Sequence, residues 1–223
     1  MRTINFLFSV FLVTVVTMCV CTSCSDSEND LMNSVSGSFE SVKSEYGIEE
    51  VSSAVIDCSS ISVTMDEMVT ILTVLRQNGS QYKECTMESC EGGYFNEDGE
   101  YLKQIIMSEK YDAVSRSGNT IDKFVLRVEL NFDIDNHQIY YLGTDYFYDS
   151  TLFEWRANGL TLCPVKNSKG NQYEFESESY LFFRISELGN NLVKVPIVFK
   201  GSYDFASDRG TYVFKLKSCN QNK

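Results

Sequence analysis

The sequence predicts a mainly β domain of the α+β class, in which an antiparallel β-meander forms a sandwich or a barrel and one N-terminal amphipathic helix packs against it. The first observation is residues 123–133, where apolar and polar side chains alternate with the period of two of a half-buried strand. The second is a series of similar runs as far as residue 216, separated by turn residues. The third is the helical spacing of apolar residues after Thr64.

Two short strands and a helix are expected first along the folded part. The strands fall at Ala54–Cys58 and Ile61–Val63, where apolar and β-branched residues are enriched. The helix is expected over Thr64–Gln77, because Thr64 and Glu67 match a capping box and an Asn-Gly pair follows its end. We expect its apolar stripe to pack on the core rather than to bind a partner. This stripe consists of Met68, Ile71, Leu72 and Leu75.

The segment after the helix is less regular. A strand is expected at Tyr82–Thr86 and another at Tyr101–Met107. Ser108–Thr120 is polar and contains Ser-Gly-Asn, which predicts an exposed loop. It would be the longest irregular stretch of the domain, and loops of that length are often functional.

The rest of the chain predicts a run of strands joined mostly by short turns. Asn158 and Gly159 form the strongest short hairpin signal. Pro164 and Pro196 lack a main-chain N–H, so each is expected at a sheet edge or a bulge. The strands are expected at residues 123–133, 138–148, 151–156, 160–165, 172–185, 192–205 and 210–216.

The first residues have the pattern of an export signal. Arg2 supplies a positive charge, and Phe6–Val20 is a mostly apolar run. This run is shorter than the roughly 20 apolar residues of a membrane-spanning helix. Thr22 and Ser23 are small residues directly before Cys24, as lipoprotein cleavage requires. The alternatives are an ordinary secretory signal and an anchor that is not cleaved.

An acidic, serine-rich stretch, Ser25–Asp30, follows Cys24. With the signal it resembles the export signal of surface lipoproteins from the Bacteroidota. The resemblance implies a lipid such as palmitate on Cys24 and attachment to the outer membrane, facing the cell surface, with the periplasmic face as the alternative. It covers only about the first 30 residues, and the folded part is assigned to no family.

The expected organisation is therefore a signal peptide at residues 1–23, an acidic and serine-rich tether at 24–46, and a single β-rich domain at 47–223. The net charge of −12 makes nucleic acid a poor partner, because phosphate binding needs a basic surface. Since acidic proteins are also repelled by anionic lipids, the lipid on Cys24 is the expected link to the membrane.

Eight cysteines are present, and three of them fall within the signal and its cleavage site. Cys85 and Cys90 are separated by four residues and could form a small disulfide loop. No metal site is expected, because His137 is the only histidine and a zinc site would need further soft or imidazole ligands close by. No cofactor is expected either.

The feature that most exceeds the average is the density of aromatic residues between residues 140 and 155. Tyr146, Tyr148 and Trp155 are candidate ligand-binding residues, because aromatic rings offer apolar area to sugars or protein partners at low entropic cost. The alternative is that Phe147, Phe153 and Trp155 belong to the core and that the tyrosines line a half-exposed sheet.

These observations favour a binding or assembly module, for a glycan or a protein partner, over an enzyme. No Gly-x-Ser-x-Gly elbow presents a nucleophile, and no candidate catalytic residue emerges from the sequence. Two alternatives remain. One is a glycan hydrolase that uses a pair of carboxylates, although the sequence marks no two of them as partners. The other is a barrel that holds a small apolar ligand.

Overall fold

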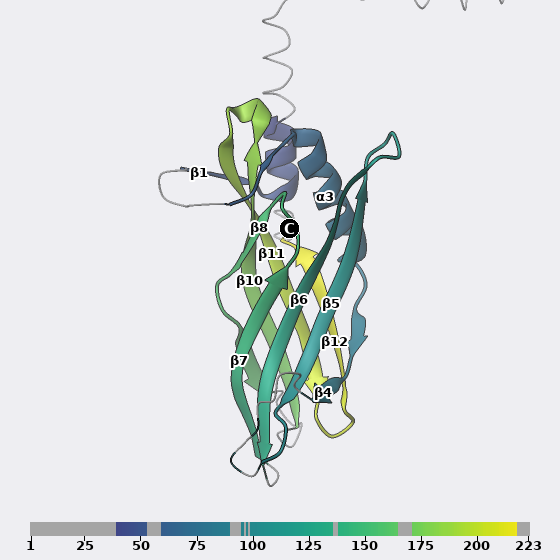
Figure 1. The fold of residues 1–223 in the computed structure, drawn as a ribbon, viewed down its shortest axis with the longest axis vertical. Helices are drawn as coiled ribbons and strands as arrows, with labels where there is room; N and C mark the ends of the chain where they lie inside the picture. The colour runs from purple at the N-terminus through teal and green to yellow at the C-terminus, as the bar shows by residue number, and fades with distance from the viewer. Residues whose placement is uncertain are drawn as a thin grey trace, which may run out of the picture. The chain divides into compact units, whose positions relative to one another are not determined.

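The computed structural model describes residues 39–52, 59–89, 95, 97, 99–135, 138–164 and 171–217. The chain divides into two compact units, Met1–Gly37 and Ser38–Lys223, and all described residues lie in the second. This unit is mainly β, with two sheets that pack face to face, as the sequence predicted (Figure 1). The predicted signal, Cys24 and the strand expected at Ala54–Cys58 lie outside the described residues.

Sheet B is an antiparallel meander with the strand order β4-β5-β6-β7. Its strands are β4 (Met87–Ser89), β5 (Lys103–Val114), β6 (Thr120–Asp135) and β7 (Gln138–Tyr148). The bounds of β7 are those predicted. Its pairing with β6 is interrupted by a register shift beside Phe132, which leaves Leu142 as an extra residue in β7.

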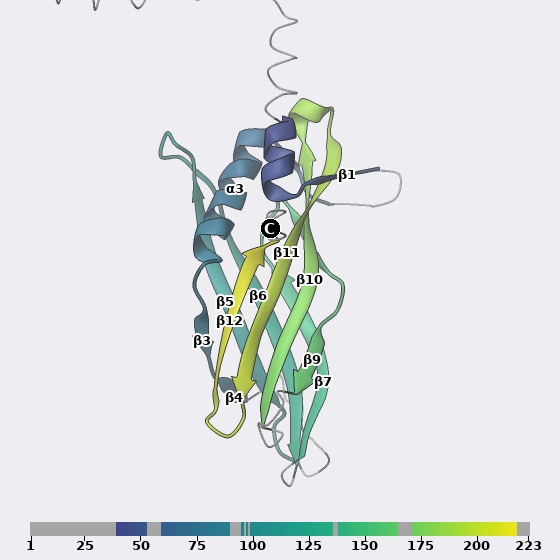
Figure 2. The ribbon, with the colours of Figure 1, turned by 180° about the vertical axis from the view of Figure 1, so that it is seen from behind.

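Sheet A forms the opposite wall, and its outer face is seen in Figure 2. Its main path is β2-β10-β11-β12-β3, while β1 pairs with β11, and β8 and β9 pair with β10. Only the β2–β10 pair is parallel among the described strands. The strands are β1 (Glu49–Val51), β2 (Ser62–Val63), β3 (Lys83–Cys85), β8 (Glu154–Ala157), β9 (Thr161–Pro164), β10 (Gln172–Ile185), β11 (Asn191–Asp204) and β12 (Arg209–Leu216).

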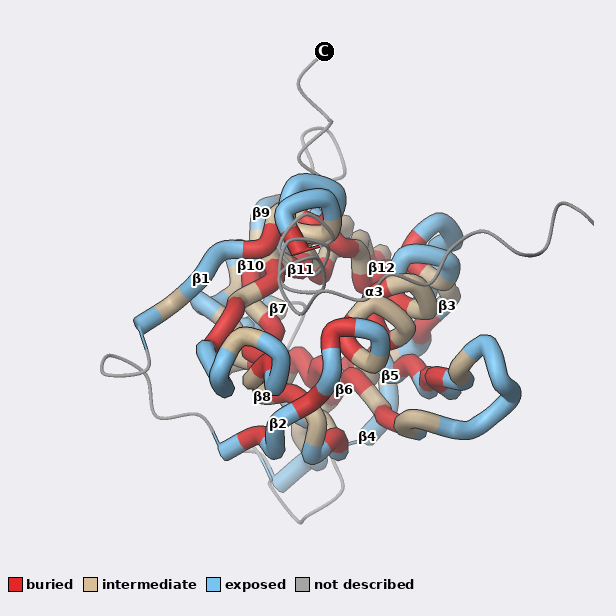
Figure 3. Tube along the Cα trace, turned by 90° about the horizontal axis from the view of Figure 1, so that it is seen from above, coloured by how far each residue is buried: buried red, intermediate tan, exposed pale blue. Residues whose placement is uncertain are grey.

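The inward-facing residues of both sheets form one aromatic and aliphatic core. Buried segments of both sheets lie toward the interior in the view along the long axis (Figure 3). The Phe124 ring meets the Phe153 ring edge-on at 5.0 Å, and the rings of Phe199 and Phe214 lie 4.9 Å apart. The predicted inner row of β6 is confirmed as buried, namely Phe124, Leu126, Val128, Leu130 and Phe132.

The predicted helix is confirmed as α3 (Met65–Asn78), which lies against β5 and β12 (Figures 1 and 2). Its capping box is formed: Glu67 N–H donates to the Thr64 hydroxyl at 3.2 Å, and the Glu67 carboxylate accepts from Thr64 N–H at 2.7 Å. The predicted stripe of Met68, Ile71, Leu72 and Leu75 is buried. No helix in the described ranges is long and apolar enough to cross a membrane.

Residues 39–46, at the end of the predicted tether, belong to the second unit. Residues 39–46 are helical, and the side chains of Phe39 and Tyr46 are buried. The Tyr46 hydroxyl lies 3.2 Å from Thr73 Oγ1, and the Arg76 guanidinium lies 4.0 Å from the centre of the Tyr46 ring. The side chain of Tyr46 therefore fixes this helical segment to α3.

The chain passes directly from one sheet to the other at the β3–β4 corner. β3 pairs with β12 in sheet A, β4 pairs with β5 in sheet B, and only Thr86 separates the two strands. Beyond this corner the edge of β5 is bonded instead by the Tyr212 hydroxyl and lies beside α3. The gap between the sheets is thus closed by a strand, a tyrosine and a helix in succession.

The structure corrects two turn predictions. The loop expected at Ser108–Thr120 is wrong, because β5 extends to Val114 and β6 begins at Thr120. The hairpin expected at Asn158 and Gly159 is also wrong, since β8 and β9 both pair with β10 along the same edge. Gly159 still takes a left-handed conformation (φ 98°), but it interrupts one edge segment rather than reversing the chain.

The two prolines lie in different kinds of strand. Pro164 lies in the edge strand β9, as predicted. Pro196 lies in β11, which is neither an edge nor bulged there. On the side of β11 away from β10, β1 pairs with residues 192–194 and β12 with residues 197–204, so Pro196 faces the gap between them. Its carbonyl accepts from Lys217 N–H at 3.0 Å. In an antiparallel sheet the N–H and C=O of one residue point to the same neighbouring strand. The Pro196 carbonyl points away from β10, so the missing N–H of Pro196 removes no hydrogen bond to β10.

Candidate ligand-binding groove

The aromatic residues chosen from the sequence lie at the junction of the two sheets. Trp155 is 5% exposed, and its indole N–H donates to Ser179 Oγ at 2.8 Å. Tyr146 is half-buried, meets the Trp155 ring edge-on at 5.5 Å and donates its hydroxyl to Ser177 Oγ at 3.0 Å. Their contacts therefore join sheet B to sheet A. Tyr148 is half-buried and stacks on Phe153. A ligand-binding role for Tyr146, Tyr148 and Trp155 stays a prediction.

The exposed aromatic residues of this region are their neighbours on β7. Phe147 is 48% exposed, so its assignment to the core is wrong, whereas Phe153 and Trp155 are buried. Alternation along the strand explains the difference, because Phe147 faces outward between the half-buried Tyr146 and Tyr148. The Arg127 guanidinium lies 5.8 Å from the centre of the Phe147 ring.

The outer face of sheet A carries a cavity of about 810 Å³ over β9, β10 and β11. Three carboxylates of β10 point into it, because Glu174, Glu176 and Glu178 are the exposed, outward-facing residues of that strand. We call this cavity the acidic end, because it forms one end of a longer groove that a second cavity continues. Its lining residues are Tyr82, Asn158, Gly159, Thr161, Cys163, Glu174, Phe175, Glu176, Glu178, Lys200, Gly201 and Ser202.

A second cavity of about 720 Å³ lies between helical residues 39–46, the end of α3, and β12. Four cationic side chains line it, and we call it the basic end. Arg76 is paired with Glu45 at 2.6 Å, and Lys217 is paired with Glu178. The lining residues are Glu45, Tyr46, Arg76, Gly79, Ser80, Tyr82, Lys200, Val213, Lys215, Leu216 and Lys217.

The two cavities form one groove, because Tyr82 and Lys200 line both of them. We call it the sheet-A groove. Tyr82 is 55% exposed, which leaves its ring accessible at the junction. Lys200 stands opposite Glu176 in the β10–β11 register, so a cation directly borders the row of carboxylates. Within the described residues neither Lys200 nor Lys215 forms an ion pair.

Gly201 shapes the floor of the acidic end. It faces Phe175 in the β10–β11 register, and a Cβ at this position would lie 2.5 Å from the Phe175 ring and 2.2 Å from the Thr211 carbonyl oxygen. The ring of Phe175 therefore occupies the space that a side chain would fill, and stacks on Phe199 at 5.4 Å.

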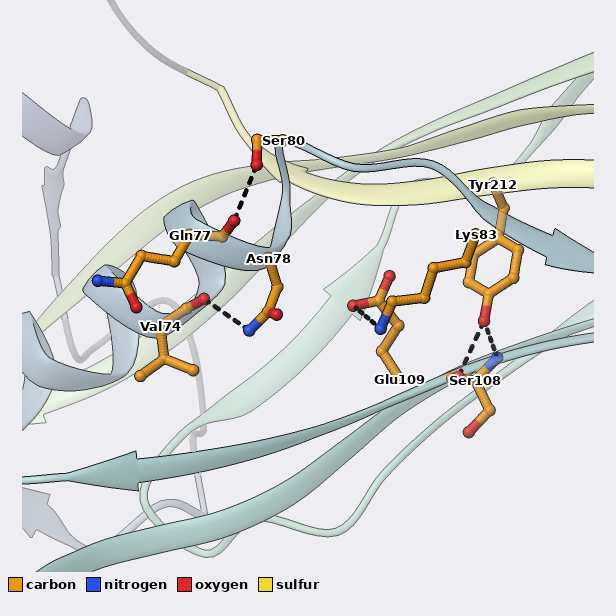
Figure 4. A network of polar contacts seen from close by, with 8 residues as sticks. All are labelled: Val74, Gln77, Asn78, Ser80, Lys83, Ser108, Glu109 and Tyr212. Atoms are coloured by element: carbon orange, nitrogen blue, oxygen red, sulfur yellow. Dashed lines mark hydrogen bonds and ion pairs between the residues drawn. The ribbon is translucent and has the colours of Figure 1, made fainter.

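A buried ion pair lies between the sheets. The Lys83 ammonium is 3.0 Å from Glu109 Oε2, and the Glu109 side chain is fully buried while that of Lys83 is 41% exposed (Figure 4). Among the described residues, neither carboxylate oxygen of Glu109 has a hydrogen bond of good geometry. Burial, and next the charge of Glu109, raise the pKa of Tyr111 and raise that of Tyr212 to about 12. Perturbed groups of this kind can mark catalytic sites, but these lie in the packed interior rather than along either cavity.

Glycoside hydrolysis would need a pair of facing carboxylates, and Glu129 and Asp145 are register partners on the outer face of sheet B. Glu129 is 7% exposed and is held by Arg127 and by Gln104 Nε2 at 3.2 Å. Asp145 accepts from Asn131 at 2.9 Å. These side chains are bonded to one another, which is typical of a structural network.

Cys24 and Cys90 lie outside the described residues, as does His137. Cys85 is a buried free cysteine whose pKa is raised to about 12 by burial, and its pairing with Cys90 stays a prediction. Cys163 is exposed at the acidic end of the groove. The part of the chain that is described holds no cluster of metal-ligating side chains.

Sequence reasoning did not find the groove residues. Tyr82 directly precedes β3, Lys200 lies in β11 and Lys215 in β12, and each is unremarkable in its local pattern. The one usable signal was the run of Glu174, Glu176 and Glu178 at period two, which predicts an acidic row on one face of a strand.

The fold and the groove together define a class of two-sheet, mainly β domains with a helix at one end and a charged groove on one outer face. The family described as "Domain of unknown function (DUF5033)" matches residues 30–216, and the chain belongs to this family. No curated protein and no solved structure matches the chain.

Proposed function

We propose that this protein is a binding module at the cell surface, held to the outer membrane by a lipid on Cys24, and that a glycan binds in the sheet-A groove. The observation that carries this proposal is the exposed Tyr82 ring at the junction of two cavities that together run across one sheet face. Attachment on the periplasmic face is the alternative location.

The chemistry of the groove suits a sugar. An exposed tyrosine ring can stack on the apolar face of a sugar ring. Carboxylate, hydroxyl and amide side chains can exchange hydrogen bonds with sugar hydroxyls. Around Tyr82 such groups are supplied by Asn158, Thr161, Glu174, Glu176, Glu178 and Ser202.

The same face is poorly suited to adding a strand from a protein partner. At the acidic end, β10 is paired with β9 and β11, and β11 is paired with β10 and β12. Their main-chain groups are therefore already used in the sheet ladders. A ligand on this face must be recognised by side chains, whereas strand addition needs a free edge.

The packing of the interior favours the groove over the alternative of a small apolar ligand inside a barrel. Large side chains from both sheets fill the described core, among them Phe124, Phe153, Phe199, Tyr203 and Phe214.

The test is affinity electrophoresis of the purified full chain, kept in mild detergent, through gels that contain neutral and acidic polysaccharides. We expect retardation in at least one gel, and we expect Tyr82→Ala to abolish it without changing the melting temperature. The matched control is Phe147→Ala, an exposed aromatic residue on the other sheet.

Retardation lost in Phe147→Ala and kept in Tyr82→Ala would move the site to β7. Retardation in none of the gels would overturn the glycan proposal in favour of a protein partner. Release of reducing sugar from a polysaccharide that retards the protein would show that the groove hydrolyses its ligand, and Glu176→Gln, which changes a carboxylate of the groove, would then be the first variant to examine.

A further inference from the structure

We propose that the sheet-A groove selects glycans in which acidic sugars alternate with uncharged ones, with the carboxylate or sulfate bound at the basic end. This inference rests on the proposed function and adds the class of ligand. It follows from the separation of opposite charges along one groove.

The basic end is unusual in this molecule. The chain has a net charge of −12, yet the cavity beside α3 is lined by Arg76, Lys200, Lys215 and Lys217, and Glu45 is the only acidic residue among its described lining residues. Lys200 and Lys215 are half-buried and form no ion pair within the described part of the chain. Two half-buried lysines without a carboxylate partner among the described residues favour an anionic group from a ligand.

The acidic end has the opposite preference. Glu174, Glu176 and Glu178 are exposed on one strand, and within the described residues only Glu178 of these three forms an ion pair, with Lys217. A carboxylate or sulfate placed over Glu174 and Glu176 would be repelled, whereas uncharged sugar hydroxyls can donate to them.

The two ends are close enough to contact neighbouring sugars of one chain. Adjacent strands lie about 4.8 Å apart. The main chain at Lys200 on β11 is therefore about 5 Å from the main chain of the acidic row on β10, and the main chain at Lys215 on β12 is about 10 Å from it. A glycan lying across the strands meets cations and then carboxylates within that distance, with Tyr82 beside the transition. A polymer with an acid on every sugar would place negative charge on both ends at once.

The test compares binding of the full chain to four polymers by isothermal titration calorimetry. Hyaluronan alternates a uronic acid with a neutral amino sugar, polygalacturonate is acidic at every sugar, dextran is neutral, and poly-glutamate is an acidic peptide. We expect hyaluronan to bind most tightly. We expect its binding to weaken as the salt rises from about 0.01 M to about 1 M, where the screening length falls from roughly 30 Å to roughly 3 Å.

Lys200→Gln and Lys215→Gln should each raise the Kd for hyaluronan roughly five-fold, since one exposed ion pair contributes up to about 1 kcal/mol. Lys110→Gln is the matched control, because Lys110 is an exposed lysine on β5 of the other sheet. The opposite substitution, Glu176→Gln, should improve binding of polygalacturonate by removing repulsion at the acidic end.

The outcomes separate this inference from the proposed function. Equal binding of dextran and hyaluronan, unchanged in the lysine variants, would overturn the charge selection and leave glycan binding intact. Polygalacturonate bound as tightly as hyaluronan would overturn the alternation. Binding of poly-glutamate alone would overturn both proposals in favour of an acidic peptide, and binding of no polymer would also overturn both.

Discussion

The hydroxyl of Tyr212 bonds both main-chain groups of Ser108, donating to the carbonyl at 2.9 Å and accepting from the N–H at 3.2 Å (Figure 4). Tyr212 belongs to β12 of sheet A and Ser108 to β5 of sheet B. One side chain therefore takes the place of a strand at the edge of β5, between the β3–β4 corner and α3. The pKa of Tyr212 is raised to about 12 by burial and, less strongly, by the charge of Glu109, so the donating hydroxyl stays protonated at neutral pH.

Tyr212→Phe should lower the free energy of unfolding by about 1–2 kcal/mol, because it leaves the N–H and carbonyl of Ser108 without their partner. Urea denaturation followed by circular dichroism measures this difference. The matched control is Tyr101→Phe, since Tyr101 is 50% exposed and should change stability by less than about 0.5 kcal/mol. Equal stability of the two variants would show that water replaces the Tyr212 hydroxyl without loss.

Lys83→Met should destabilise the fold through the charge that it leaves behind. Glu109 is fully buried, and its carboxylate has the Lys83 ammonium at 3.0 Å as its ion-pair partner. Removing one partner of a buried pair costs roughly 3–5 kcal/mol. We expect about 2 kcal/mol here, because the Lys83 side chain is 41% exposed.

A double variant tests the reason for this loss. Lys83→Met combined with Glu109→Gln removes the unpaired charge, so it should be more stable than Lys83→Met alone. Chemical denaturation at neutral pH measures both. If the double variant is the less stable one, the Lys83 side chain stabilises the fold by packing rather than by charge.

The parts of the fold that the sequence predicts well are those with a strong local pattern. The capping box at Thr64 and Glu67 fixed the start of α3, and alternation from Phe124 to Phe132 located β6 and its buried face. Local patterns sufficed because the period of two and the helical spacing each reflect one buried face.

The sequence predicted poorly where a tertiary contact decides the structure. The loop expected after Met107 is instead strand, because Tyr111 and Ala113 face the core and the buried Glu109 interrupts the apolar row. The tight turn expected at Gly159 requires β8 and β9 to pair with each other, but both strands pair with the longer strand β10 instead. The groove likewise requires the β3–β12–β11–β10 order, which no local pattern contains.

Gly201→Ala should destabilise the fold by about 1–3 kcal/mol, a typical cost of overpacking. The new Cβ would lie 2.2 Å from the Thr211 carbonyl oxygen, which is main chain of the neighbouring strand and cannot move without disturbing the sheet. Gly143→Ala is the matched control, because it adds the same group to a strand glycine that has no atom within 4 Å of the added Cβ. Thermal unfolding of both variants measures the difference. A similar melting temperature for the two would show that Phe175 and β12 adjust freely.

Glu187 links the turn between β10 and β11 to the start of α3. Its carboxylate accepts from Met65 N–H, at 3.0 Å to one oxygen and 3.2 Å to the other, and from the Ser186 hydroxyl at 2.7 Å. Burial acts to raise the pKa of Glu187, but these bonds and its own N–H outweigh burial and leave the pKa below its ordinary value of 4.5. The negative charge also lies at the positive end of the helix dipole.

Glu187→Gln should therefore lower the free energy of unfolding by about 0.5–1 kcal/mol at neutral pH, as loss of a helix-capping anion does. Because the folded-state pKa is depressed, the stabilisation by Glu187 is fully present above the unfolded-state pKa and is lost as the pH falls through the folded-state pKa. The stability difference between the two proteins should thus shrink as the pH falls from neutral through the folded-state pKa of Glu187. Urea titrations across this range measure it, with Glu88→Gln, an exposed glutamate of β4, as control. A difference that stays constant with pH would mean that Glu187 acts through its shape and not through its charge.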